Sequence, residues 1–138
     1  MHAEMTTELY WLVLTVIMTA LIWVPYILNR MHECEQGAWA AVCNPQPDTQ
    51  PNAQWAVRLM RAHANAVENL VVFAPLVLAL QLVGANTKLT ATACMVYFIA
   101  RVAHVLLYTF GVPLLRTLAF AIGVACQMVL GLTILHVI

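Results

Sequence analysis

The sequence predicts an all-α membrane protein, a four-transmembrane-helix bundle that forms one domain over residues 1–138. Of these residues, 63% are apolar and only 9% are charged, and the mean hydropathy is +0.84. Soluble domains carry about 25% charged residues, so most of this surface is expected to face lipid. A span needs about 20 residues, which leaves room for four spans. The net charge is zero, and we expect membrane lipids rather than nucleic acid as partners.

The first span is expected over residues 9–28, with aromatic side chains near both ends and with Pro25 bending its final turns. A cleavable signal peptide has a basic start and a shorter apolar core. The start of this chain contains Glu4 and Glu8 but no Lys or Arg. We therefore expect this segment to remain as a membrane helix.

The second span is expected over residues 52–83, where Gly84 is a natural C-terminal stop and Pro75 is expected to kink the helix. The first three turns of this helix are too polar for lipid contact, and the part after Ala66 is apolar.

Two further spans follow after short turns. The third is expected over residues 89–108, capped by Asn86 or Thr87. The fourth is expected over residues 113–137, since Pro113 suits the first turn of a helix.

The one long link, about residues 29–51, is polar and leads into the proline-rich run NPQPDTQPN. Basic residues gather on the side of the membrane that holds this link and the short turn between the third and fourth spans. These residues are Arg30, Arg58, Arg61 and Arg116. Lys88 alone marks the opposite side. The positive-inside rule places both links in the cytoplasm, so both termini are expected on the non-cytoplasmic side.

The four cysteines are interpreted within this topology. Cys94 and Cys126 lie inside spans and are expected to fill small apolar gaps. Cys34 and Cys43 lie in the long link, where a cytoplasmic setting keeps thiols reduced and an inverted topology would allow a disulfide. Together with His32 they form too weak a pattern to predict a metal site.

Polar residues recur on one face of each of the last three spans, if each residue turns the helix by about 100°. These residues are Arg58, Arg61, Asn65 and Glu68 on the second span, Arg101, His104 and Tyr108 on the third, and Arg116, Phe120, Gly123 and Gln127 on the fourth. His63 points elsewhere. Because neighbouring spans run in opposite directions, the three faces are expected to meet at one depth, in the cytoplasmic half of the membrane.

One interpretation of this layer is purely structural. Glu68 could pair with Arg61 or Arg101 and hold the bundle together. Arg58 and Arg30 are suited to reach the lipid headgroups.

The second interpretation is a ligand site. Arg61, Arg101 and Arg116 stand against one carboxylate, that of Glu68, and the surplus positive charge favours an anionic ligand. Arginine is well suited to bidentate recognition of carboxylates, while Asn65 and Glu68 could receive an ammonium or amide group. We favour the ligand site.

Two stretches resemble a known family. RAHANAVEN (residues 61–69) resembles the signature of the membrane-associated proteins in eicosanoid and glutathione metabolism, the MAPEG family. RVAHVLLYTFGVPLLRTLAF (residues 101–120) resembles the third-to-fourth helix segment of that family. The resemblance covers about residue 58 to the end, together with the four-helix plan. It implies a homotrimer that binds glutathione, as co-substrate, between subunits in the cytoplasmic-side layer of the membrane.

The resemblance also implies roles for single residues. Those implied to bind glutathione are Arg61, Asn65 and Glu68, for its carboxylate and amino ends, and Arg101, His104 and Tyr108, which would line the pocket. Arg116 matches an arginine near the thiol and Thr117 a hydroxyl beside it, so these two are the candidate catalytic residues. A thiol has a pKa of about 8.5, and a cation at the positive end of a helix would stabilise the thiolate. The implied activity is transfer of glutathione to a lipophilic electrophile, or reduction of a hydroperoxide.

Two positions depart from the family pattern. Ala64 stands where several eicosanoid-making members have an arginine, and Phe120 stands where several have a tyrosine that contacts the thiol. The alternative function is therefore a non-catalytic membrane subunit of the same fold, acting as a scaffold or lipid-binding partner. A transporter is disfavoured because the chain shows neither internal repeats nor paired broken helices.

Overall fold

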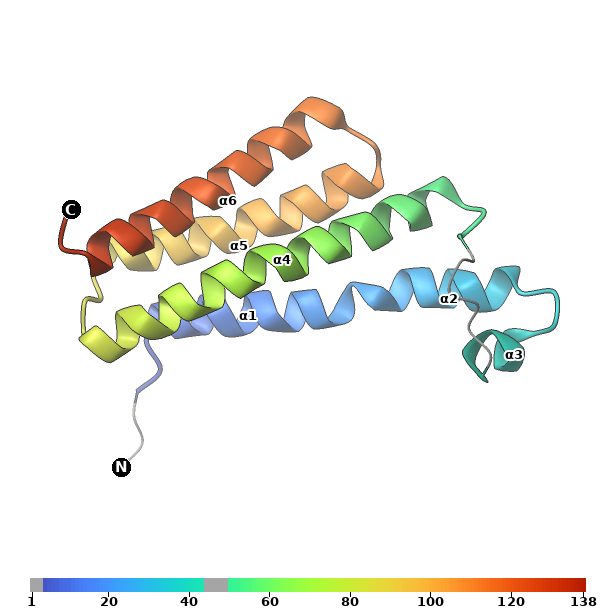
Figure 1. The fold of residues 1–138 in the computed structure, drawn as a ribbon, viewed down its shortest axis with the longest axis horizontal. Coiled ribbons are helices and arrows are strands. Elements are labelled where there is room, and N and C mark those ends of the chain that lie inside the picture. Colours follow the sequence, from blue (N-terminus) through green and yellow to red (C-terminus); the bar gives the residue numbers. More distant parts are fainter. Residues whose placement is uncertain (1–3, 44–49) are drawn as a thin grey trace.

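A computed structural model of the chain describes residues 4–43 and 50–138. The helices in this part are α1 (Thr7–Leu21), α2 (Trp23–Glu33), α3 (Ala38–Cys43), α4 (Gln54–Val83), α5 (Lys88–Thr109) and α6 (Pro113–Ile134). Four stretches are long and apolar enough to cross a membrane: Thr7–Glu33, Gln54–Val83, Lys88–Thr109 and Pro113–Ile134. The predicted four-span helical fold is confirmed. Figure 1 shows both termini at one end of the bundle.

The first span consists of α1 and α2, which follow one another end to end and are separated at Ile22 (Figure 1). The interruption has a local cause, because Pro25 has no N–H to donate to the carbonyl of Leu21. Helix α2 continues to Glu33, beyond the expected end of this span at residue 28. Its polar last turn stays helical because Asn29 Nδ2 donates to Glu33 Oε1 at 2.9 Å, one helical turn away.

The long link contains the short helix α3, in which Ala41 is buried. Residues 44–49, which hold most of the run NPQPDTQPN, lie outside the described residues. The start of α4 is tied back to the first span, since the Glu33 carboxylate accepts hydrogen bonds from the backbone N–H groups of Asn52 (2.9 Å) and Ala53 (3.0 Å). The carboxylate thus satisfies backbone donors at the start of α4 from outside that helix.

The turns between the later spans have local causes in the sequence. Gly84 ends α4 with φ +66, and its N–H bonds the carbonyls of Leu80 and Gln81. Thr87 caps α5 through a reciprocal pair of hydrogen bonds with Thr90. Pro113 is the first residue of α6, as predicted.

The apolar core is concentrated in the half of the bundle nearest the termini. It includes Leu12, Val77 and Leu130, and the rings of Phe73 and Tyr97 stack there with centroids 3.7 Å apart. The other half has only a small buried cluster around Ile22, Leu59 and Ala66, where polar residues of α4 and α5 occupy interior positions instead.

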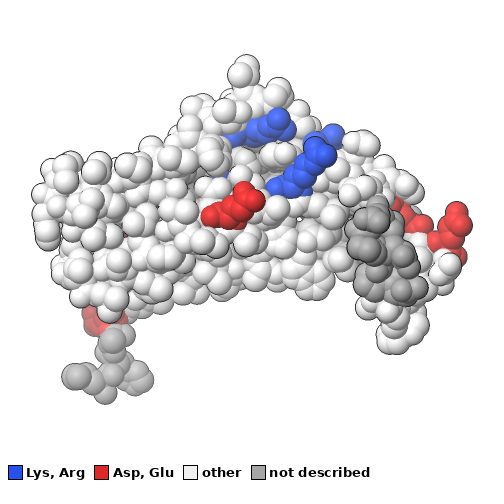
Figure 2. All heavy atoms as spheres, viewed as in Figure 1, with Lys and Arg blue, Asp and Glu red and all other residues white. Residues whose placement is uncertain are grey.

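The outer surface is mainly apolar, as lipid contact requires. Leu82 is 88% and Leu114 is 82% exposed. Figure 2 shows one face of the molecule, on which the blue basic side chains gather over the half away from the termini, with red acidic atoms beside them and further red atoms at both ends of the bundle. On this face the basic charge, but not the acidic charge, is thus gathered in one half of the bundle.

Candidate functional site

Arg101 lies at the centre of the predicted layer and is 1% exposed. Its Nη2 donates to Asn65 Oδ1 at 2.7 Å and lies 3.3 Å from His104 Nδ1. Its Nε and Nη1 are buried and have no hydrogen-bond partner among residues 4–43 and 50–138. A Cβ at Gly123 would lie 3.7 Å from Arg101 Cδ, an ordinary van der Waals contact, so the Arg101 side chain packs beside α6 at Gly123. A buried guanidinium with neutral partners and unused donors is a strong local source of positive charge.

Asn65 is held by a second amide on the same helix. Asn69 Nδ2 donates to the backbone carbonyl of Asn65 at 2.9 Å and lies 3.3 Å from Asn65 Oδ1. Gln127 of α6 donates from Nε2 to the carbonyl of Asn69 at 3.2 Å. Asn69 and Gln127 are both buried. The polar interior therefore continues from Arg101 through α4 to α6.

Aromatic rings cover the next part of the layer. The guanidinium Cζ of Arg116 lies 4.6 Å from the ring centroid of Tyr108, an arrangement typical of a cation–π contact. The centroid of the His104 ring lies 5.6 Å from that of the Tyr108 ring and 6.3 Å from that of the Phe120 ring. The last turn of α5 and the first turns of α6 thus bring together three of the predicted site residues, Arg116, Tyr108 and His104.

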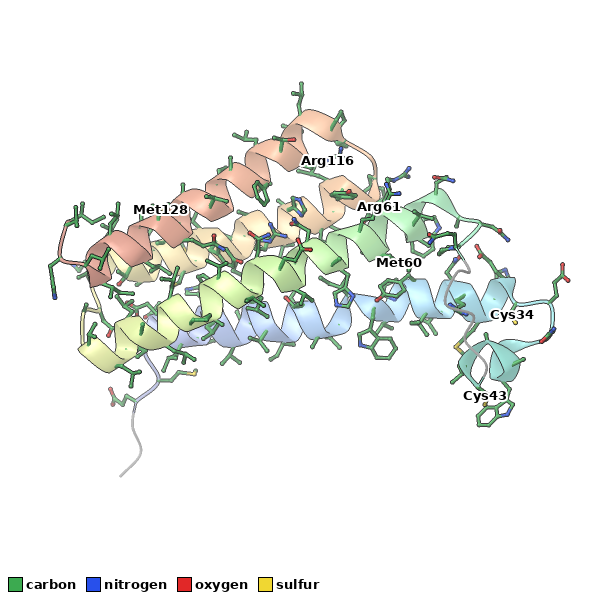
Figure 3. The ribbon with its side chains drawn as sticks, in the orientation of Figure 1. Cys34, Cys43, Met60, Arg61, Arg116 and Met128 are labelled. Atoms are coloured by element: carbon green, nitrogen blue, oxygen red, sulfur yellow. The ribbon has the colours of Figure 1, made fainter. Side chains whose placement is uncertain are left out.

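The remaining predicted residues face outward from the single chain. Arg61, Glu68 and Thr117 are exposed, and the Thr117 hydroxyl donates to the Pro113 carbonyl of its own helix at 3.1 Å. Arg101 donates to Asn65 rather than to Glu68, so the ion pair considered for those two residues is not formed. Figure 3 shows Arg61 on α4 and Arg116 on α6 in the same half of the bundle, away from Met128.

A hollow of about 550 Å³ opens on the outer face of α4 beside Arg61. Met60, Val57 and Ala64 also line it. Ala64, the position that departs from the family pattern, thus lines the same hollow as Arg61.

Some polar contacts of this half were not foreseen. Arg58, interpreted as reaching for headgroups, donates instead from Nε to the Thr109 carbonyl at the end of α5, at 2.8 Å. His63 indeed points away from the layer, and its Nδ1 lies 2.8 Å from the Tyr26 hydroxyl of α2. Both contacts join segments far apart in the sequence, so helical periodicity alone could not reveal them.

All four cysteines lie within the described residues, and none of them forms a disulfide there. Cys34, Cys43, Cys94 and Cys126 are all free. Within residues 4–43 and 50–138 no group of three or more His, Cys, Asp or Glu side chains is arranged to hold a metal ion.

Comparison with known proteins identifies the family to which the chain belongs. The model of the MAPEG family matches residues 7–136, nearly the whole chain. No curated protein and no solved structure matches. The match includes all four spans and every residue of the polar layer. The chain is therefore an integral, multi-pass membrane protein that belongs to the MAPEG family.

Proposed function

We propose that this chain is a glutathione-dependent membrane transferase or peroxidase that acts on lipophilic electrophiles or hydroperoxides. The observation that carries the proposal is the Arg101 guanidinium, buried between α4 and α6 with Asn65 and His104 as neutral partners. Membership of the MAPEG family supports a role connected with glutathione in general. Glutathione has two carboxylates, and a layer with surplus arginine suits such a ligand.

The residues present fit glutathione in their donor chemistry. Arg101 has two buried donor nitrogens that no described residue accepts from, and Arg61 is exposed and lines the hollow on α4. Glu68, an exposed carboxylate on the same helix, can receive the ammonium group. In this proposal Arg61, Asn65 and Glu68 hold the ends of the peptide, while Arg101, His104 and Tyr108 form the pocket wall.

The thiol chemistry is assigned to the start of α6. Val112, the residue that precedes this helix, makes no side-chain cap, so the first N–H groups of α6 remain open to a negative charge. Arg116 would stabilise the thiolate, and Thr117 would donate a hydrogen bond to it in place of the bond that its hydroxyl gives to the Pro113 carbonyl. In a transferase reaction, the sulfur forms a bond to an electrophilic carbon and the leaving group departs with its electron pair. In a peroxidase reaction, two glutathione molecules reduce a hydroperoxide to an alcohol and water and become a disulfide.

A site shared between subunits of a homotrimer is part of the proposal. Arg61, Glu68 and Thr117 face outward from the single chain, whereas Arg101 and His104 face inward. A second copy packed against this face would enclose the outward residues and complete the pocket. We place this layer on the cytoplasmic side of the membrane and both termini on the opposite side, following the distribution of arginine.

Glutathione binding by the detergent-solubilised protein tests the proposal. We expect binding at or below millimolar glutathione, a trimeric mass, and conjugation of a generic aryl halide or reduction of a lipid hydroperoxide. Lys88→Ala, at the other end of the bundle, should bind like the wild type. An intact trimer that binds no glutathione at millimolar concentration would reject the proposal.

The second candidate function is a non-catalytic scaffold or lipid-binding subunit. Two structural details favour it: Ala64 adds no charge beside Arg61, and Phe120 offers no hydroxyl near His104. Glutathione binding without conjugation or peroxide reduction would support this candidate.

A further inference from the structure

Asn65 carries an amide whose direction is fixed by its neighbours. The atom 2.7 Å from Arg101 Nη2 must be the amide oxygen, because a guanidinium only donates hydrogen bonds. The NH2 group of Asn69 approaches the same oxygen at 3.3 Å and also bonds the Asn65 backbone carbonyl at 2.9 Å. Two donors therefore converge on Asn65 Oδ1, and the NH2 group of Asn65 must point the other way.

The NH2 group of Asn65 is free to meet a ligand. It donates to no residue within 4–43 and 50–138. It is also not fully buried, unlike the unpartnered nitrogens of Arg101. Asn65 itself is half-buried. The group thus reaches the surface of the single chain, on the helix that also carries Arg61 and Glu68.

The same reasoning assigns the His104 tautomer. Because Arg101 Nη2 can only donate, Nδ1 of His104 accepts at 3.3 Å and the ring proton of neutral His104 lies on Nε2. His104 therefore also presents a donor away from Arg101. Asn65, His104 and Arg101 together offer N–H groups and no acceptor oxygen.

We infer that Asn69 and Gln127 are positioning residues, which turn the Asn65 amide so that this part of the layer binds a carboxylate and not an ammonium group. The inference rests on the proposed function. Asn69 holds the amide from one helical turn away, and Gln127 holds the Asn69 backbone from α6 at 3.2 Å. Without Asn69, the Asn65 oxygen keeps one donor and the amide turns more freely.

This inference divides the ends of glutathione between residues. A carboxylate of the ligand lies at the free NH2 group of Asn65, with the buried positive charge of Arg101 directly behind that amide. The ammonium group goes to Glu68, an exposed carboxylate that accepts no hydrogen bond from residues 4–43 and 50–138. Asn65 is thereby excluded as an ammonium acceptor, since its oxygen is already occupied by Arg101.

Asn69→Leu, which removes the amide at similar volume, tests the inference in the full-length protein in detergent. We expect its glutathione Kd to rise by about tenfold, roughly the loss of one well-oriented hydrogen bond to a charged group. Turnover at saturating glutathione should stay within about twofold of wild type, because Arg116 is untouched. Gln127→Leu should shift the Kd in the same direction by a smaller factor. It keeps the inference testable if Asn69→Leu fails to fold.

Gln81→Leu is the matched control. It also removes an amide from α4, and Gln81 Nε2 is buried with no hydrogen-bond partner in the described part of the chain. This variant should leave the glutathione Kd unchanged. If it weakens binding as much as Asn69→Leu does, the effect reflects general loosening of α4 and the inference is wrong.

The diethyl ester of glutathione, in which both carboxylates are blocked, supplies the decisive comparison. Wild type should bind the ester more weakly than glutathione, and Asn69→Leu should bind the ester as wild type does, because the oriented donor no longer has a carboxylate partner. Equal losses for glutathione and the ester would overturn the positioning role alone. A wild-type protein that binds neither compound would instead remove the proposed function, and this inference with it.

Discussion

The Nη2 atom of Arg101 lies 2.7 Å from Oδ1 of Asn65, so the third span and the second span share a charge-assisted hydrogen bond inside the bundle. No carboxylate takes part in this contact. The arrangement leaves a buried positive charge with neutral partners, at the level where the apolar core is thinnest. Burying such a charge costs desolvation free energy, so it is unfavourable if Arg101 has only a structural role. A bound ligand anion would offset this cost.

Arg101→Leu separates a ligand role from a structural role. Replacing a buried charge by an apolar side chain is often neutral or stabilising, while Asn65 loses one partner. We expect the free energy of unfolding in detergent to change by no more than about 2 kcal/mol. Glutathione affinity should fall by about 100-fold or more. Arg101→Lys, which keeps the charge but loses the planar donor array, should bind with intermediate affinity. Unfolding of Arg101→Leu together with normal binding by Arg101→Lys would indicate a structural role.

The fold could be predicted because its signals are local. Apolar runs of sufficient length mark the spans, and Gly84, Thr87 and Pro113 end or begin helices by their own backbone and side-chain preferences. The helical repeat also brought Arg101 and His104 onto one face, where they indeed lie together. The link was less predictable, because α3 is short and the last polar turn of α2 depends on the Asn29–Glu33 contact.

The direction of each polar group within the site could not be predicted from one helix at a time. The Asn65 amide is turned by Arg101 of another span, and Arg58 is drawn to the end of α5. Residues that helical periodicity places on the same face also differ in how far they are buried. Asn65 is half-buried and Glu68 is exposed, although the two lie close together on α4.

Arg116→Ala is expected to impair chemistry more than binding. Arg116 lies over the Tyr108 ring at the start of α6, next to the open N–H groups of that helix. Its removal should raise the pKa of the thiol of bound glutathione, which is measured by the thiolate absorbance as the pH is varied. At neutral pH we expect kcat to fall by about 10- to 100-fold, with less than about a threefold change in glutathione affinity. Full thiolate absorbance and full rate in this variant would assign the thiol elsewhere.

Phe120→Tyr is expected to increase activity. The Phe120 ring lies 6.3 Å from that of His104 and is 37% exposed, so it lies beside the proposed pocket and the single chain does not enclose it. One further hydrogen bond to the thiolate should raise conjugation by about 3- to 10-fold at neutral pH. Phe120→Leu, which adds no hydroxyl, serves as the comparison and should not exceed the wild-type rate. An unchanged rate in Phe120→Tyr would place the sulfur out of reach of this position.

Arg58→Met should affect stability without affecting the ligand. Arg58 Nε donates to the Thr109 carbonyl at 2.8 Å, and its guanidinium lies against the α5–α6 turn, where Gly111 has φ +77. Loss of this contact leaves the last carbonyls of α5 without their cation, at an expected loss of about 1–2 kcal/mol of stability. Hydrogen exchange should accelerate at the amides of the turn, while glutathione affinity stays within about twofold of wild type. Arg30→Met, at the same end of the bundle but on α2, should leave exchange in this turn unchanged. If Arg58→Met weakens glutathione binding as much as Arg101→Lys does, Arg58 belongs to the site, and the polar layer extends to the end of α5.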